Sequence, residues 1–234
     1  MDTIILLETS TELCSTAIAR DGRIISYRES GTPRAHASLT AVFVQEMLDE
    51  TGIRLGDCSA VCVSMGPGSY TGLRVGVSTA KGLCFGAGLP LVAVGTLDTL
   101  VWQAISEGNV PEGCRHIVPM IDARRMEVYT SVFSADGRQE EDVRPAVLEP
   151  GSFRSLSGSG PVLFIGDGAG KASEVIDLPD AIFIQCCPKA SAMLIPAMAE
   201  YKSERFKDVA YFEPFYLKEF VVTASRKDPL RRHV

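Results

Sequence analysis

Long apolar runs are absent from this sequence of 234 residues. A membrane-spanning helix needs roughly eighteen consecutive apolar residues, and no stretch reaches that length. Met1 is followed at once by a strand-like segment, not by the charged and then apolar stretch of a secretion leader. We therefore expect a cytoplasmic protein with no membrane association.

Metal-ligating residues are scarce and poorly spaced. The three histidines, His36, His116 and His233, share no ligand spacing. The seven cysteines are an odd number, scattered and mostly inside apolar segments, which favours reduced, buried thiols over a disulfide framework. No cysteine pair has the spacing of zinc ligands, so we expect neither a metal site nor cysteine chemistry.

Basic charge is also limited, because the formal net charge is −6. A surface that holds a nucleic-acid backbone needs clustered Lys and Arg, so we expect this chain to contact nucleic acid only weakly or through another protein. The C-terminal tail could touch nucleic acid, or it could be an ordinary solvated terminus. Its cationic residues are Arg226, Lys227, Arg231, Arg232 and His233.

The elements in the first half predict mixed sheets with helices. Asp21-Gly22 is a strong hairpin signal between two strands. We expect Thr96 to cap a helix that runs to residue 105. Strands are expected at 3–7, 14–20, 24–30, 60–65 and 89–94, and helices at about 35–51 and after 68. The loop at 106–114 is the best boundary between an N-terminal lobe (1–106) and a smaller C-terminal lobe (107–234) whose tail could return to the first.

The second half begins the same scheme and abbreviates it. A glycine-rich turn at 166–171 leads into a short helix, and Ser191 is a candidate cap for a helix to about 205. Strands are expected at 117–121, 127–133, 162–165 and 182–185. Repeated strand-rich units with inserted helices are typical of the duplicated α/β fold of the actin, sugar-kinase and Hsp70 type, here with an abbreviated second lobe.

The long helix after Gly68 has apolar or small residues on more than one side. Its sheet-facing stripe is predicted to contain Leu73, Val77, Ala80 and Cys84. The opposite side has a row of small residues, with Arg74 on one flank, that would let another helix approach closely. That row consists of Ser78, Gly82 and Gly86. Cover by another layer of the same fold is the alternative.

The helix at 35–51 also has more apolar surface than one sheet would bury. Its apolar arc spans about 200°, against the ~100° stripe that faces a sheet. The sequence does not decide which stripe faces the sheet and which lies beside the small-residue row, facing a partner helix pair. The two stripes are Leu39, Phe43 and Met47 on one side, and Val44 and Leu48 with Ala41 on the other.

Four motifs together resemble one family. They are LLETST at 6–11, GPGSYTGLRVGVSTAKGL at 66–83, DARRMEVY at 122–129 and GDGA at 166–169. This combination resembles the TsaB family, glycoprotease-like dimerisation subunits of the bacterial machinery that makes threonylcarbamoyladenosine in tRNA. The resemblance spans nearly the whole chain and is most specific at 66–83. Glu8 stands where the family usually has Asp, a conservative departure.

The resemblance implies a non-catalytic scaffold. It implies homodimers when the chain is alone, and a heterodimer with the catalytic paralogue TsaD through the N-terminal helices. A TsaE-like ATPase would join the complex, and ATP or ADP could bind at the interface, although no cofactor is assigned to this chain itself. The complex would transfer threonylcarbamoyl to the adenosine next to the anticodon of tRNAs that read codons starting with A.

The candidate anion contacts are weaker. The turn at 66–69 opens a helix whose amides attract anions, but it matches neither the dinucleotide nor the Walker pattern. Glu8, Ser10 and Thr11 could polarise a phosphate-bound water in an actin-like cleft, or could simply form a turn and hairpin. Gly68 and Ser69 are candidate contacts at the start of the helix. In the second lobe, Asp122, Arg124 and Arg125 could pair with an acidic partner or form a solvated turn.

An enzyme active on its own is the alternative function, either an actin-like ATPase or a carbamoyl-type transferase. The catalytic paralogue has an HxxxH pair, whereas Thr40 stands four residues after His36. The short second lobe also favours the scaffold. A peptidase would need a Ser-His-Asp or zinc constellation, and the sequence supports none. We therefore assign no catalytic residue.

Overall fold

The first sheet is built entirely from the N-terminal lobe. The structure, a computed structural model, describes residues 2–158 and 160–217. The five strands are β1 (Thr3–Glu8), β2 (Cys14–Arg20), β3 (Arg23–Ser30), β4 (Ala60–Gly66) and β5 (Leu91–Gly95). Their order is β3-β2-β1-β4-β5, with antiparallel pairing on the β3 side of β1 and parallel pairing on the β5 side. All six residues of the central strand β1 are buried, as expected for a strand covered on both faces.

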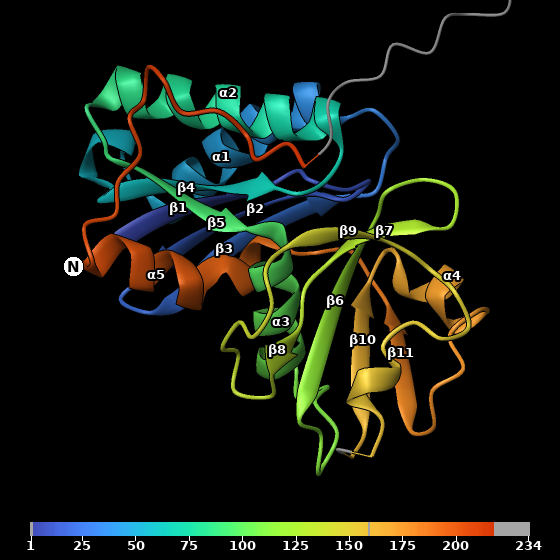
Figure 1. Cartoon of the computed structure of the whole chain (residues 1–234). Helices are drawn as coiled ribbons and strands as arrows, with labels where there is room; N and C mark the ends of the chain where they lie inside the picture. Colours follow the sequence, from blue (N-terminus) through green and yellow to red (C-terminus); the bar gives the residue numbers. More distant parts are fainter. Residues whose placement is uncertain (1, 159, 218–234) are drawn as a thin grey trace, which may run out of the picture.

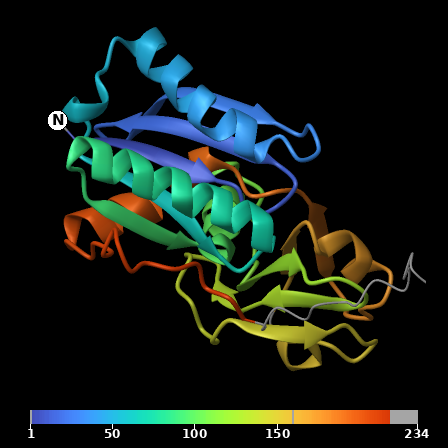
Figure 2. The ribbon, with the colours of Figure 1, turned by 90° about the horizontal axis from the view of Figure 1, so that it is seen from above.

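Two helices lie side by side on one face of this sheet (Figures 1 and 2). They are α1 (His36–Thr51) and α2 (Tyr70–Ala87), and a short 3₁₀ turn, η1 (Leu55–Asp57), follows α1. α1 covers β2 and β3, whereas α2 covers β4. The opposite face is covered by α5 (Leu194–Lys202) and the 3₁₀ turn before it, η3 (Ala190–Met193). The first lobe therefore has three layers, with α1 and α2 outermost on one side.

A second sheet forms the other lobe. Its strands are β6 (His116–Asp122), β7 (Glu127–Thr130), β8 (Phe133–Ser134), β9 (Arg144–Val147), β10 (Val162–Gly166) and β11 (Ala181–Gln185). The order is β11-β10-β6-β7-β9, and β8 pairs with β6. The helix α3 (Thr96–Ser106) lies between the lobes, contacting β5 on one side and β6 on the other (Figure 1). A 3₁₀ turn, η2 (Arg154–Leu156), and α4 (Ala169–Ser173) complete this lobe.

Several local predictions are confirmed. Asp21 and Gly22 form the β2–β3 turn, both with positive φ (49° and 77°), as a two-residue hairpin requires. Gly52 ends α1 at φ 67°, and its N–H is directed at the carbonyls of Leu48 and Asp49. The glycine-rich turn at 166–171 does lead from a strand into a short helix. Local sequence therefore determined where these elements begin and end.

Three local predictions are wrong. Thr96 is the first residue of α3, not its cap, and its buried hydroxyl lies 2.9 Å from that of Ser64. Ser191 lies within η3, so α5 begins only at Leu194 and ends at Lys202, before the predicted position 205. The strand predicted at 127–133 is divided into β7 and β8, because the chain at 131–132 bonds to residues 140 and 141 instead. The neighbouring strand β9 was not predicted.

Candidate functional site

α2 has an inner row of glycines that the sequence analysis missed. The row consists of Gly68, just before the helix, and Gly72 and Gly76 within it. A Cβ atom on any of the three would lie within 3.0 Å of an atom of Thr9 or Ser10. These glycines therefore let the start of α2 lie directly on the loop that follows β1. Their four-residue spacing was the available signal.

The outer row of α2, defined as Ser78, Gly82 and Gly86, is exposed as predicted. A Cβ on Gly82 or Gly86 would have no neighbour within 4 Å. The sheet-facing prediction for Leu73, Val77, Ala80 and Cys84 is confirmed, since all four are buried. No described part of the chain covers the outer row, so cover by another layer of the same lobe does not explain it.

The stripes of α1 differ from the prediction. Val44, Met47 and Leu48 are only 1%, 0% and 6% exposed and belong to the core beneath α1 and α2. They face the sheet, so the prediction that they form a partner-facing surface is wrong. Leu39 and Phe43 are half-buried. The two predicted stripes are thus not alternatives, because one residue or more of each lies in the core.

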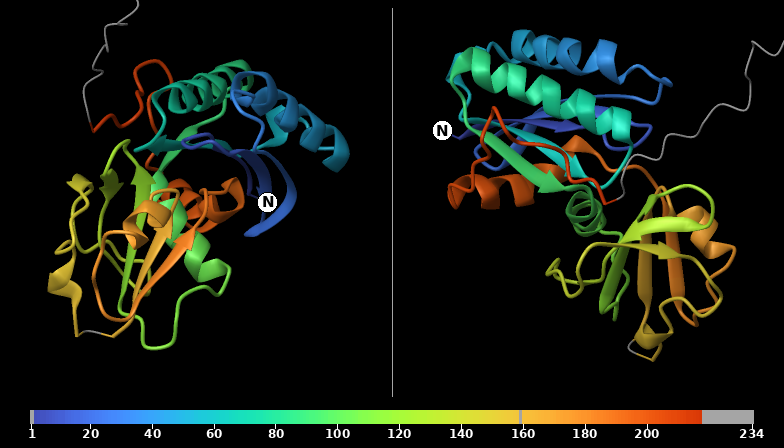
Figure 3. Two further views of the ribbon diagram at one scale, coloured as in Figure 1. Left: turned by 90° about the vertical axis from the view of Figure 1, so that its right-hand side faces the viewer. Right: turned by 45° about the horizontal axis from the view of Figure 1, so that its top comes forward.

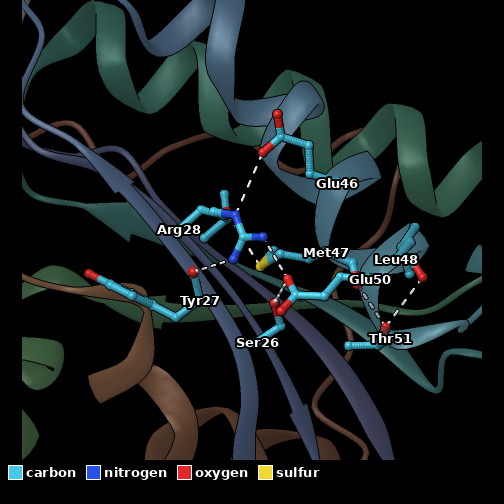
Figure 4. Close-up of polar contacts among 9 residues, drawn as sticks. Ser26, Tyr27, Arg28, Glu46, Met47, Leu48, Glu50 and Thr51 are labelled. Atoms are coloured by element: carbon cyan, nitrogen blue, oxygen red, sulfur yellow. Dashed lines mark hydrogen bonds and ion pairs between the residues drawn. The ribbon is translucent and has the colours of Figure 1, made fainter.

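An ion-pair cluster shows which flank of α1 faces away from α2. Arg28 of β3 lies 3.6 Å from Glu46 and 2.6 Å from Glu50, and it donates to the carbonyl of Tyr27 (Figure 4). Arg28 lowers the pKa of Glu50, with help from the Ser26 hydroxyl. Because β3 is the edge strand, the flank of α1 with both glutamates faces the edge of the sheet.

Leu39 and Phe43 share that flank, because positions 39, 43, 46 and 50 follow one another at helical spacing. They therefore do not lie beside the outer row, and that part of the prediction is wrong. The opposite flank has Ala37 and Ala41, both exposed, and borders α2. Leu48 on this side shares a core cluster with Leu83 of α2. The surface between α1 and α2 is consequently lined by small residues.

The chain after α5 returns along α2, and residues 203–217 are called the strap below (Figures 1 and 3). The ammonium group of Lys81 donates to the carbonyls of Ala210 at 2.9 Å and Phe212 at 3.1 Å. The backbone N–H of Phe215 donates to the carbonyl of Met65 at 2.7 Å. The strap therefore adds a side wall to α2, although it is far from α2 in sequence.

Arg74, expected at the interface, lies at the start of α2 and is exposed. Its guanidinium group lies over the ring of Tyr70 at 4.1 Å and donates to the Tyr70 hydroxyl. Tyr216 of the strap stacks on the same ring, with 4.5 Å between centroids. Arg74 is thus held by the ring of Tyr70, on which Tyr216 of the strap also stacks.

The predicted anion contacts come together but bond to one another. The Glu8 carboxylate is fully buried and accepts the Ser10 N–H at 2.7 Å, and burial raises the pKa of Glu8 to about 7. The Ser69 N–H donates to the Ser10 carbonyl at 2.6 Å, and the Ser69 hydroxyl accepts the Gly72 N–H. Gly68 touches Ser10. The N–H groups of Ser69 and Gly72 at the start of α2 therefore bond within the chain, and the inner row places this turn directly against Thr9 and Ser10.

Three buried oxygens of this loop have no hydrogen-bond partner among the described residues: Glu8 Oε2, Ser10 Oγ and Thr11 Oγ1. Burial raises the pKa of Glu8, and the neighbouring Ser10 groups offset only part of that rise. The loop is accordingly suited to a protonated or water-bonded Glu8, and less suited to holding a phosphate.

The polar cluster of the second lobe is a braced hairpin. Lys171 Nζ lies 3.1 Å from Asp122 and donates to the carbonyls of Arg125 and Glu127. Asp122 accepts the Arg124 N–H, and its own N–H donates to Asp167, whose pKa burial raises to about 6. Arg124 and Arg125 are exposed, as a solvated turn predicts.

The described residues contain no cluster of three His, Cys, Asp or Glu side chains that could hold a metal ion. His36 bonds to the carbonyl of Thr11, and His116 pairs with Glu140. All seven cysteines are free. No helix in the described part of the chain is both long and apolar enough to span a membrane. The cationic tail that begins at Arg226 lies outside the described residues.

Comparisons with known proteins agree with this architecture. A family model described as TsaD, tRNA N6-adenosine threonylcarbamoyltransferase, matches residues 30–211. TsaB of Escherichia coli K12, a tRNA threonylcarbamoyladenosine biosynthesis protein, is 32% identical over 228 residues, which cover 93% of this chain and 95% of that protein. A crystal structure of a Pseudomonas aeruginosa protein with similarity to peptidase YEAZ superposes with a TM-score of 0.83 at 28% identity, covering 93% of this chain and 100% of that chain.

A more distant structure shares only the fold. The ADPNP-bound activator of 2-hydroxyisocaproyl-CoA dehydratase from Clostridium difficile superposes with a TM-score of 0.52 at 9% identity, over 87% of this chain and 97% of that chain. The two mixed sheets and this likeness confirm the predicted actin-like α/β fold. Together with the relatives that match along most of its length, they lead to one conclusion: the chain belongs to the TsaB family.

Proposed function

We propose that this chain is a non-catalytic scaffold in the synthesis of threonylcarbamoyladenosine in tRNA, and that it binds and activates a TsaD-like paralogue. The observation that carries the proposal is the uncovered outer row of α2, next to the small residues of α1. A helix pair that packs closely on another helix pair needs such a surface, because small residues let the backbones approach. Membership of the TsaB family supports a role in the synthesis of threonylcarbamoyladenosine in tRNA.

The candidate catalytic groups also support a scaffold. Thr40 stands where an HxxxH pair would have its second histidine, and its buried hydroxyl bonds to the His36 carbonyl at 2.7 Å. Glu8 is fully buried, next to the loop on which the inner row packs, so its carboxylate is not exposed to a substrate. The chain supplies a surface, and the reacting groups belong to the paralogue.

The same surface serves two partners in this proposal. A second copy would occupy it when the chain is alone, and the TsaD-like paralogue would displace that copy, so the two associations compete. A TsaE-like ATPase joins the heterodimer, and tRNA is held mainly by the other subunits. Any ATP or ADP binds at the junction of the heterodimer. The modified base is the adenosine next to the anticodon in tRNAs that read codons starting with A, and the complex works in the cytoplasm.

Reconstitution with tRNA and a threonylcarbamoyl donor tests the proposal. We expect no transfer and no useful ATP hydrolysis by the pure chain, and transfer once the TsaD-like and TsaE-like proteins are added. Loss of the histidine pair in the paralogue should abolish that transfer, whereas Glu8→Gln in this chain should not. Robust turnover by the chain alone, abolished by Glu8→Ala, would show that it is an enzyme in its own right.

A further inference from the structure

Phe85 is the most exposed large apolar side chain among the described residues. It is 86% exposed, and Tyr211 on the strap is 84% exposed. Phe85 lies three residues from Gly82, so the ring and the outer row are within about 5 Å of each other along the helix axis. An exposed aromatic ring next to the outer row is typical of a surface that contacts another protein.

A groove of about 510 Å³ lies beside Phe85, between α2 and the strap. Its lining consists of Lys81, Gly82, Phe85, Asp208, Val209 and Ala210. Lys81 donates to the strap carbonyls, and Asp208 accepts the N–H groups of Ala210 and Tyr211 at 2.8 and 3.0 Å. The polar groups of the wall are therefore already satisfied, which leaves a braced and mostly apolar groove.

We propose that this groove receives Phe85 from a second copy of the chain. The proposal rests on the proposed function, because it uses the same face of α2. An exposed knob and an empty groove lie on one face, less than one helical turn apart. A two-fold axis beside Gly82 would place each Phe85 against the groove of the other copy, which is the self-complementary arrangement of a symmetric dimer.

The area that a dimer must bury favours a second copy over a small ligand. A stable interface buries roughly 800 Å² on each partner, and a ridge of Gly and Ser provides little of it. One fully buried aromatic side chain adds roughly 150 to 250 Å² per copy. Because Phe85 itself lines the groove, a small molecule there would touch its ring but leave the outer row exposed. A second copy would cover Phe85, the groove and the outer row together.

The strap then becomes part of the subunit interface. Its residues 208–211 form one wall of the groove, and Lys81 holds that wall on α2. Gly82 lets the α2 helices of the two copies approach closely, and Phe85 acts as the buried aromatic anchor that many interfaces have near their centre.

Sedimentation equilibrium of three variants tests the proposal. We expect Phe85→Ser to raise the dimer dissociation constant at least ~10-fold, as for a central aromatic anchor. Val147→Ser is the matched control, because Val147 is 61% exposed on the second lobe, and it should leave dimerisation unchanged. Gly82→Leu is run in parallel. If Phe85→Ser dimerises like the wild type while Gly82→Leu is monomeric, Phe85 does not enter the groove, but the proposed interface at the outer row still holds. Dimerisation by both would refute both.

A photo-crosslinking phenylalanine analogue at position 85 gives an independent readout. Isotope-labelled and unlabelled full-length chains are mixed, so that links between copies are recognised by their mixed mass. We expect inter-copy links to the peptide that contains residues 208–210. Links confined to a single chain, including to residues 218–234, or inter-copy links to another surface, would overturn the proposal.

Discussion

The hydroxyl of Thr9 donates to the carbonyl of Gly72 at 2.8 Å, which ties the loop after β1 to the first turns of α2. The helix that has the exposed outer row is thus fixed to the loop that contains Ser10 and Thr11, two of the predicted anion contacts. The inner row makes this contact possible, because only glycine leaves room for the loop. Gly82 and Gly86 of the outer row have a different role, since a Cβ atom on either would have no neighbour within 4 Å.

Replacing glycine by alanine should have opposite effects on the free energy of unfolding in the outer row and in the inner row. Gly82→Ala should raise the free energy of unfolding by about 0.5–1 kcal/mol, because alanine favours the helix and no atom lies near its Cβ. Gly72→Ala gains the same helix propensity but drives a Cβ into the carbonyl of Thr9, so we expect a net loss of about 2 kcal/mol. Urea unfolding measures both. Equal effects of the two variants would contradict the assigned roles of the rows.

Because Glu8 is buried, we expect the free energy of unfolding to depend on pH. Burial raises its pKa from 4.5 to about 7, so the folded state holds the proton more tightly than the unfolded state. Its stabilising contribution is complete below pH 4.5 and is lost as the pH rises toward 7, a total of about 3 kcal/mol. Glu8→Gln cannot ionise. The variant should therefore gain stability relative to the wild type between pH 5 and pH 8, as measured by urea unfolding. A difference that does not vary with pH would be contrary to a buried, titrating Glu8.

We expect Lys81 to stabilise the strap against local unfolding. Lys81→Met removes the charged donor from the carbonyls of Ala210 and Phe212. A hydrogen bond to a charged group contributes about 1.5 kcal/mol, so amide hydrogen exchange in residues 208–213 should accelerate roughly tenfold. The core of α2 should keep its protection. Lys202→Met, at an exposed position on α5, is the control, and equal acceleration in both variants would mean that Lys81 does not hold the strap.

Helix periodicity and turn chemistry predicted the exposed outer row, the buried stripe of α2 and the β2–β3 hairpin. These features depend on residues close together in the sequence. The flank of α1 that faces β3 could not be predicted, because it depends on how α1 packs on strands distant in sequence; Arg28 of β3, which pairs with Glu46 and Glu50, shows which flank it is. Both flanks of α1 have apolar residues, so periodicity alone gave no preference.

The candidate site was predicted only in part. Glu8, Ser10, Gly68 and Ser69 do come together, but the sequence did not show that backbone N–H groups of Ser10 and Ser69 bond within this set. That closure depends on how deeply the inner row lets α2 lie on the loop. The strap was unpredictable for a similar reason, since Lys81 is separated by more than a hundred residues from the carbonyls that it holds.

Sedimentation velocity with the purified TsaD-like paralogue tests the central claim most directly, using the wild type, Gly82→Ala and Gly82→Leu. We predict that the wild type and Gly82→Ala form homodimers and that the paralogue converts them to heterodimers. Gly82→Leu should keep the wild-type circular dichroism spectrum but sediment as a monomer with and without the paralogue, because a leucine side chain blocks close backbone approach. A Gly82→Leu protein that still forms the heterodimer and still supports tRNA modification would contradict the account, because the interface would then lie elsewhere.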